Sequence, residues 1–213
     1  MDAIILAGGL GTRLSSVVHD IPKCMAPVAG EPFLYYLLRY LSNYPINKVI
    51  LSVGHLREHI FTWIASSRDQ FPFSIDYAIE ETPLGTGGAI RLAMKQVQDN
   101  EAIIINGDTF FDVDINLLLC QHRNSGTALS MALKPMSQFE RFGNVVLGEN
   151  SRIETFQEKQ YCEHGLINGG IYIINRIHSF FTGQPERFSF EKNVLENPKN
   201  RGLISGFPHE KYF

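Results

Sequence analysis

The sequence predicts an α/β protein built on a doubly wound, mostly parallel sheet. Strand-like and helix-like segments alternate over the first 135 residues, and glycine-rich connections follow several of the strands. The expected strands are the apolar runs at 3–6, 48–53, 74–79, 102–106 and 128–134. Such alternation is typical of parallel sheets, whose ligands bind at the carboxyl ends of the strands. We therefore expect a ligand site at that edge.

The segments between these strands predict helices. They lie at 33–41, 55–66, 86–97 and 115–123, and in the first of them the leucines fall on one helical face. Four aromatic residues there favour core packing and leave a homodimer interface open: Phe33, Tyr35, Tyr36 and Tyr40.

The pattern changes from about residue 142. Shorter strand-like pieces at 144–147, 152–157 and 167–174 precede a predicted helix at 189–196. This change indicates a small β-rich subregion added to the sheet. We still expect one domain, because 213 residues of ordinary globular composition suit a single core.

Charge and cysteine content limit the partners. A formal net charge of -3 gives no support for nucleic acid or an anionic membrane surface as a partner, and no apolar run approaches 18 residues. The three cysteines, Cys24, Cys120 and Cys162, are odd in number and widely spaced, which favours a reducing, cytoplasmic location. Cys24 is adjacent to Lys23, yet a buried apolar role is favoured over a reactive one.

The first strand leads into a glycine-rich loop, Ala7-Gly8-Gly9-Leu10-Gly11-Thr12-Arg13-Leu14. Its glycines allow a ligand close to the backbone, and exposed N–H groups in such a loop attract anions. Arg13 and Lys23 add donors suited to phosphate. The loop lacks the Gly-Lys-Ser/Thr of a Walker A motif, and Leu14 replaces the third glycine of a dinucleotide motif. The alternative is a strand-to-helix turn without a ligand.

Two further connections carry candidate chemistry. Asp108 follows the strand ending in Asn106-Gly107 and offers the hard oxygen ligands that suit Mg²⁺, although it could instead cap the next helix. We expect Asp114 to be that cap. Residues 81–89 form a second glycine-rich connection whose backbone could contact the edge of a base, or could simply cap the following helix.

One pattern indicates a different chemistry. His55-Leu56-Arg57-Glu58-His59 matches the H-x-x-E-H pattern of inverted zinc peptidases. Three specified residues in five make a weak match, and the predicted fold is wrong for such an enzyme. A solvent-exposed helix start is the favoured interpretation.

Five motifs occur in an order that resembles a known family. They are 6–14, 22–28, 83–89, Asn106-Gly107-Asp108 and Asn168-Gly169-Gly170-Ile171-Tyr172. Together they resemble the sugar-phosphate nucleotidylyltransferases (NDP-sugar pyrophosphorylases) from residue 2 to about 196. Residues 52–54, 84–90 and 189–192 are most similar to the short D-glycero-α-D-manno-heptose 1-phosphate guanylyltransferases. The resemblance implies a Rossmann-like fold with nucleotide binding in 1–135 and sugar phosphate binding in 136–213.

The resemblance also implies residue roles. Arg13, Lys23 and Asp108 would be catalytic, with Asp108 the Mg²⁺ ligand, Arg13 on the β- and γ-phosphates and Lys23 near the α-phosphate. The nucleotide would be held by Leu6, Ala7, Gly8, Gly9, Gly11, Thr12, Arg13, Glu81, Leu84, Gly85, Thr86, Gly87, Gly88, Asn106 and Gly107. The sugar 1-phosphate would be held by Gly143, Glu158, Lys159, Asn168 and Gly169.

The implied reaction joins a nucleoside triphosphate to a sugar 1-phosphate and releases pyrophosphate. It requires no protein nucleophile, since the sugar phosphate oxygen is already ionised; alignment and charge neutralisation suffice. GTP with a heptose or mannose 1-phosphate is the expected pair. UTP, CTP or dTTP with a hexose 1-phosphate, or a non-catalytic nucleotide-sugar-binding homologue, are the alternatives.

Two positions depart from the family pattern. The family's second metal aspartate belongs to a Phe-x-Asp-x-Gly-type segment, which would start near Lys211-Tyr212-Phe213, so we expect the native chain to continue past Phe213. Gln160 replaces a frequent proline, so the loop at Glu158-Lys159 is expected to be less rigid.

Overall fold

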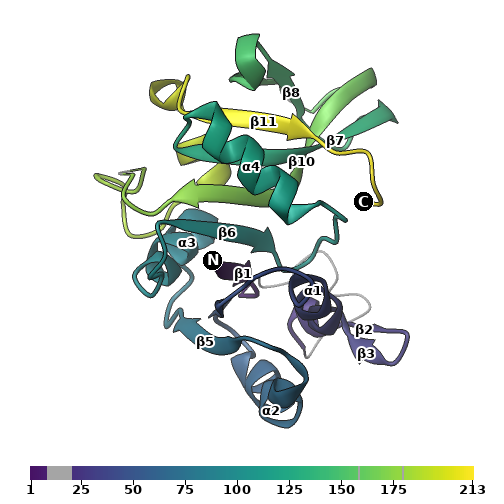
Figure 1. The fold of residues 1–213 in the computed structure, drawn as a ribbon, viewed down its shortest axis with the longest axis vertical. Coiled ribbons are helices and arrows are strands. Elements are labelled where there is room, and N and C mark those ends of the chain that lie inside the picture. Colours follow the sequence, from purple (N-terminus) through teal and green to yellow (C-terminus); the bar gives the residue numbers. More distant parts are fainter. Residues whose placement is uncertain (9–20, 158, 179) are drawn as a thin grey trace.

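The computed structural model describes residues 1–8, 21–157, 159–178 and 180–213. Its central feature is a seven-stranded sheet in the order β11-β7-β10-β6-β1-β4-β5, which runs from the top to the bottom of Figure 1. The strands are β1 (Asp2–Leu6), β4 (Lys48–Val53), β5 (Ser74–Ile79), β6 (Glu101–Asn106), β7 (Leu129–Phe139), β10 (Cys162–Asn175) and β11 (Ile204–Pro208). β6, β1, β4 and β5 are mutually parallel and β11 is parallel to β7, whereas β10 is antiparallel to both of its neighbours. The predicted doubly wound, mostly parallel sheet is confirmed.

Helices cover both faces of the sheet. Alternate residues of β1 enter different cores: Ala3 and Ile5 pack with α1 (Phe33–Leu41), α2 (Arg57–Ser67) and α4 (Ile115–Ser125). Ile4 packs with α3 (Gly85–Met94) and with apolar residues of 180–195. Because successive side chains of a strand point to opposite faces, a continuous apolar run such as β1 must be covered on both sides.

Short helical turns complete the chain. They comprise Lys23–Met25, Arg68–Gln70, Glu149–Ser151, Pro198–Asn200 and a π-type turn at Glu191–Leu195. The predicted cap of α4 is confirmed, since the Asp114 carboxylate accepts a hydrogen bond from the Leu117 N–H at 3.1 Å. In the part of the chain that the structure describes, no helix is both long and apolar enough to cross a lipid bilayer.

The C-terminal third differs in detail from the sequence prediction. In this third, the separate two-stranded sheet consists of β8 (Asn144–Leu147) and β9 (Ile153–Gln157). A smaller two-stranded sheet, β2 (Pro27–Val28) and β3 (Glu31–Pro32), lies earlier in the chain. The predicted piece at 167–174 is instead part of β10, which lies inside the central sheet. β11 was not expected, because Gly206 and Pro208 break the apolar pattern by which strands are recognised.

Three of the four aromatic residues of α1 pack in or against the core as predicted, namely Phe33, Tyr35 and Tyr40. Tyr40 is buried, and its hydroxyl donates to the Val113 carbonyl oxygen. Tyr35 meets Trp63 edge to face, with ring centroids 6.5 Å apart. These contacts join α1 to α2 and to the connection before α4.

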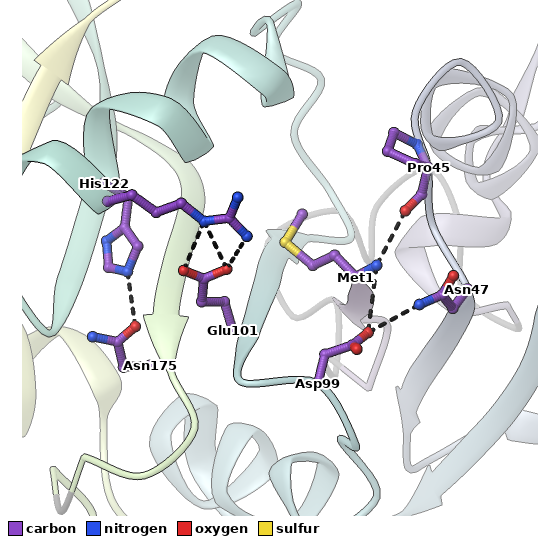
Figure 2. A network of polar contacts seen from close by, with 8 residues as sticks. Met1, Pro45, Asn47, Asp99, Glu101, His122 and Asn175 are labelled. Atoms are coloured by element: carbon purple, nitrogen blue, oxygen red, sulfur yellow. Dashed lines mark hydrogen bonds and ion pairs between the residues drawn. The ribbon is translucent and has the colours of Figure 1, made fainter.

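The edge of the sheet where β1 and β6 begin carries a polar network (Figure 2). Asp99 accepts from the Asn47 amide at 3.1 Å and pairs with the Met1 amino group at 3.4 Å. Glu101 and Arg123 form a multidentate pair with a shortest N–O distance of 2.6 Å. The His122 ring is hydrogen-bonded through both nitrogens, to Ser130 Oγ at 2.8 Å and to Asn175 Oδ1 at 3.0 Å. Below, this set of residues is called the amino-edge network.

Candidate functional site at the carboxyl edge of the sheet

A cavity of about 880 Å³ lies at the opposite edge of the sheet. Its walls come from the residues that follow β1, β4, β5 and β6, together with the start of α3 and the segment 187–191. The predicted site edge is therefore the edge at which the structure has its large cavity. The volume is within the range of small-molecule and cofactor sites.

Many of the residues predicted to be catalytic or to bind nucleotide line this cavity. They are Leu6, Ala7, Gly8, Lys23, Glu81, Gly85, Thr86, Asn106, Gly107 and Asp108. Leu84, Gly87 and Gly88 are absent from its lining. Gly9, Gly11, Thr12 and Arg13 lie outside the described residues.

One end of the cavity holds an ion pair. Lys23 Nζ is 3.2 Å from Asp108 Oδ2, and the two residues are 85 positions apart in the sequence. The Lys23 side chain is 25% exposed and that of Asp108 is 49% exposed, so the carboxylate still faces solvent. Asp108 does not cap α4, since Asp114 does. The pair thus offers a cation and a partly free carboxylate to the same ligand.

The surroundings of Asp108 suit a divalent cation that is shared with a substrate. Within the described ranges, no three His, Cys, Asp or Glu side chains are grouped so as to hold a metal. Mg²⁺ is usually bound by one or two carboxylates, with substrate phosphates and water completing the octahedron. An exposed Asp108 beside a cavity of this size fits that mode of binding.

The start of α3 is held by a segment distant in sequence. Gly87 N–H donates to the Phe188 carbonyl at 3.0 Å, and a Cβ added at Gly87 would lie 2.2 Å from the Phe188 ring. Thr86 Oγ1 donates to Glu191 Oε2 at 2.7 Å, and Ser189 Oγ donates to the same oxygen at 2.7 Å. Gly87 is thus required for close packing, while Thr86 and Glu191 form a polar part of the cavity wall.

Glu80 is a site residue that the sequence analysis missed. Its carboxylate accepts from the Leu84 N–H at 3.0 Å and from Ser52 Oγ at 3.3 Å, and it lines the cavity. Burial raises the pKa of this carboxyl, with the two hydrogen bonds acting in the opposite direction. A Cβ added at Gly8 would lie 2.9 Å from Glu80 Oε1. Glu80 therefore ties the end of β4 to the start of α3 and lies close to Gly8, and only its position beside Glu81 could have indicated it.

The predicted sugar phosphate residues occupy two places. Asn168 and Gly169 lie at an irregularity in the pairing of β10 with β7, and a Cβ added at Gly170 would meet the Asn106 side chain at 2.8 Å. Asn168 Nδ2 donates to the hydroxyl of the buried Tyr172 at 2.8 Å. Gly143 precedes β8 and the exposed Lys159 follows β9, at the open end of that hairpin. None of these four lines the cavity, and Glu158 is outside the described residues.

The structure decides two minor interpretations of the sequence. Cys24 is buried, and burial raises the pKa of its thiol to about 12, so the apolar role is confirmed. For the zinc motif, Leu56 adopts a left-handed backbone conformation with φ 60° and α2 begins only at Arg57. His55 therefore precedes the helix, and the two histidines do not share one helical face.

A family model described as nucleotidyl transferase matches residues 2–186. The chain belongs to the nucleotidyl transferase family. The resemblance seen in the motifs is thereby confirmed, and residues of several of those motifs line the cavity, including Gly8, Lys23 and Asp108. Nucleotidyltransferases of this family generally use a divalent metal ion.

Known proteins similar to this nucleotidyl transferase include two curated enzymes. It is 44% identical over 213 residues to the D-glycero-alpha-D-manno-heptose 1-phosphate guanylyltransferase of Aneurinibacillus thermoaerophilus, covering 100% of this chain and 91% of that one. It is 45% identical over 201 residues to the enzyme of the same name from Campylobacter jejuni subsp. jejuni, covering 93% and 87%.

A solved structure is similar as well. HddC from Yersinia pseudotuberculosis, complexed with GMP-PN, superposes with a TM-score of 0.86 at 34% identity, covering 99% of this chain and 91% of that one. The expected fold class is thus confirmed by both the sheet topology and a related structure.

Proposed function

We propose that this protein is a sugar 1-phosphate guanylyltransferase that uses GTP and a heptose 1-phosphate and forms a GDP-sugar and pyrophosphate. The observation that carries the proposal is the cavity that joins the glycine-rich end of β1 to the Lys23–Asp108 pair. The names of the two curated relatives at 44% and 45% identity supply the substrate class.

The proposed chemistry is a displacement at the α-phosphorus. An ionised oxygen of the sugar 1-phosphate forms the new P–O bond, the bond from the α-phosphorus to the bridging oxygen breaks, and pyrophosphate leaves. The main obstacle is repulsion between two anionic substrates, because both carry several negative charges. A residue such as Lys23, with one ammonium group at the cavity wall, reduces that repulsion where the charges meet.

The predicted site residues enter this proposal by position. Lys23 would contact the α-phosphate, Gly8 and Gly107 would let the nucleotide approach the backbone, and Asp108 would hold Mg²⁺. When bound, Mg²⁺ neutralises phosphate charge and orients the reacting groups. Arg13 keeps its predicted role on the β- and γ-phosphates. Asn168, Gly169, Gly143, Glu158 and Lys159 keep theirs at the sugar phosphate.

We further propose that the chain functions as a single nucleotidyltransferase domain, with 1–135 serving the nucleotide and 136–213 the sugar phosphate. Cys24, Cys120 and Cys162 are free thiols, which supports a cytoplasmic, reducing location. Nucleotide sugars made there would supply glycan assembly.

The test is pyrophosphate release from the full-length gene product. GTP, UTP, CTP, dTTP and ATP are each combined with heptose, mannose and glucose 1-phosphates, with Mg²⁺ or with EDTA. We expect release only with GTP and a heptose or mannose 1-phosphate, abolished by EDTA. Release with another nucleotide would contradict the guanylyl assignment. No release with any pair, from a protein that still binds nucleotide, would favour a non-catalytic homologue.

A further inference from the structure

The order of the strands fixes the direction of a nucleotide in the cavity. From β6 through β1 and β4 to β5, neighbouring strands are about 4.8 Å apart, so the wall extends for about 14 Å. Asp108 follows β6 and Gly8 follows β1 at one end, while Gly54 follows β4 and Glu81 follows β5 at the other. Phosphates held beside Lys23 and Asp108 therefore place the base at the β4–β5 end.

A second ion pair occupies that far end. Arg57, the first residue of α2, lies 3.4 Å from Glu81 Oε2 through Nη1 and 3.5 Å through Nη2. Its Nε is 3.7 Å from Glu58 Oε1. All three residues line the cavity. The Arg57–Glu81 pair thus links the start of α2, which follows β4, to the connection that follows β5.

The contacts of Arg57 leave it able to bind a ligand. Charged hydrogen bonds to carboxylates are usually 2.7–2.9 Å long, and its three carboxylate contacts among the described residues are all longer. The Arg57 side chain is 28% exposed, whereas that of Glu81 is 77% exposed. The guanidinium is thus largely enclosed and borders two carboxylates, and its contacts within the described ranges do not use all five of its N–H donors.

We propose that Arg57 is a specificity-determining residue that recognises guanine, an inference that rests on the proposed function. Guanine presents two adjacent acceptors, O6 and N7, and the fork of an arginine matches both. Adenine has an amino group in place of O6, and its N–H donors would face those of Arg57. The same side chain therefore attracts one purine and repels the other, which is how specificity is commonly built.

The competing explanation is purely structural. Arg57 could serve only to tie the start of α2 to the connection after β5, through Glu81. In that case removal of the side chain would weaken every nucleotide equally. Recognition of guanine predicts a loss that depends on N7 and O6 of the base.

The experiment compares Arg57→Met and Arg57→Lys with wild type, using GTP, 7-deaza-GTP and ATP. Methionine removes the charge and keeps a high helix propensity, whereas lysine keeps the positive charge but lacks the paired N–H donors of the guanidinium group. Arg68→Met, at the other end of α2 and outside the cavity lining, is the matched control. Thermal melting checks that each variant is folded.

We expect wild type to lose about 10-fold in kcat/KM on 7-deaza-GTP, since one acceptor is removed. Arg57→Met should lose about 5- to 150-fold on GTP, the range for one bidentate contact, and should no longer distinguish GTP from 7-deaza-GTP. Arg57→Lys should keep part of the GTP activity and lose most of the discrimination. Arg68→Met should behave as wild type.

The failures of the two proposals are distinguishable. If wild type turns over GTP but Arg57→Met loses GTP and 7-deaza-GTP activity by the same factor, recognition by Arg57 is overturned and the proposed function stands. If wild type binds GDP without turnover, the proposed function fails, and the same comparison made with the Kd values of GDP and 7-deaza-GDP decides on Arg57. A wild type that neither binds nor uses a guanine nucleotide overturns both.

Discussion

The two edges of the central sheet use their charged residues in opposite ways. In the amino-edge network the Glu101–Arg123 pair is multidentate at 2.6–3.2 Å, and His122 is hydrogen-bonded through both ring nitrogens. At the carboxyl edge, Lys23–Asp108 and Arg57–Glu81 meet at 3.2 Å and 3.4 Å and border a cavity. The first arrangement satisfies its groups internally, whereas the second leaves donor and acceptor capacity for a ligand.

The carboxyl groups of Glu80 and Glu101 show the same contrast. Burial raises the pKa of Glu80, so its ionised form opposes folding at neutral pH. Hydrogen bonds from Arg123 lower the pKa of Glu101, so its ionised form favours folding. The half-buried charge of Glu80 at the carboxyl edge thus lowers the free energy of unfolding while it fixes the geometry of the site. The paired charge of Glu101 at the amino edge raises the free energy of unfolding.

The largest effect is expected for Asp108→Asn. Loss of this charge should lower kcat/KM by about 100- to 1000-fold, the usual effect of removing one group that stabilises developing charge. The melting temperature should change by about 2 °C or less, because Asp108 is half-exposed and contributes to no core. Arg13→Ala is expected to reduce turnover similarly.

Asp112→Asn is the matched control for Asp108. Asp112 lies in the same connection as Asp108, its carboxylate pairs with the Lys211 ammonium group at 3.6 Å, and it does not line the cavity. Steady-state rates and thermal melts of both variants make the comparison. Equal activity of Asp108→Asn and Asp112→Asn would contradict the role of Asp108.

Gly107→Ala should reduce stability at the site edge. A Cβ there would lie 2.4 Å from the Leu6 carbonyl oxygen, which belongs to the backbone and must shift. Overpacking of this kind lowers the free energy of unfolding by about 1–3 kcal/mol. Gly54→Ala is the control, since its Cβ would have no neighbour closer than 3.7 Å. Urea denaturation should separate the two variants; equal midpoints would refute the close approach of β1 and β6.

Glu80→Gln and Glu101→Gln should change stability in opposite directions. At pH 7 the first removes a charge whose folded pKa is raised, so the free energy of unfolding should stay the same or increase. The second removes a charge whose folded pKa is lowered, and about 1 kcal/mol should be lost. As the pH falls, Glu80 is protonated first because its folded pKa is raised, whereas Glu101 keeps part of its contribution until the pH falls below its lowered pKa. Denaturation curves at pH 7 and pH 4 measure the free energy of unfolding of both variants. If both variants are stabilised, or both destabilised, at pH 7, the proposed contrast between Glu80 and Glu101 is contradicted.

The smallest effect concerns His122. Burial lowers its pKa below 6.5, opposed by its contacts with Asn175 and Glu101, while Arg123 adds to the lowering. The unfolded chain therefore takes up a proton that the folded protein resists, and stability should fall as the pH drops through about 6.5 toward the lowered pKa of the folded protein. His122→Gln should flatten this part of the pH dependence by less than about 1 kcal/mol. Burial also lowers the pKa of His209, so both histidines contribute to the pH dependence of stability in this range. The contribution of His122 is therefore the difference between the pH dependence of wild type and that of His122→Gln.

The sequence by itself determined the strands and helices whose residue pattern is complete within one segment. The strands at Lys48–Val53 and Ser74–Ile79 and the helix at Phe33–Leu41 have the predicted bounds, because an apolar period of a strand or helix is complete within one segment. The glycine-rich connections and Asp108 were likewise visible, since each follows its strand directly. Parallel strands then bring those connections to one edge.

Tertiary structure alone decided the contacts between distant segments. Glu80 reaches Ser52, Arg57 reaches Glu81, and Thr86 meets Glu191 across 105 positions of sequence. β10 enters the sheet antiparallel, and β11 completes it although its own residues do not read as a strand. The physical reason is that the two partners of each of these contacts belong to separate segments of the chain, which only the folded sheet brings together. Which charge meets which depends on the order of strands in the sheet, and that order is a property of the whole core.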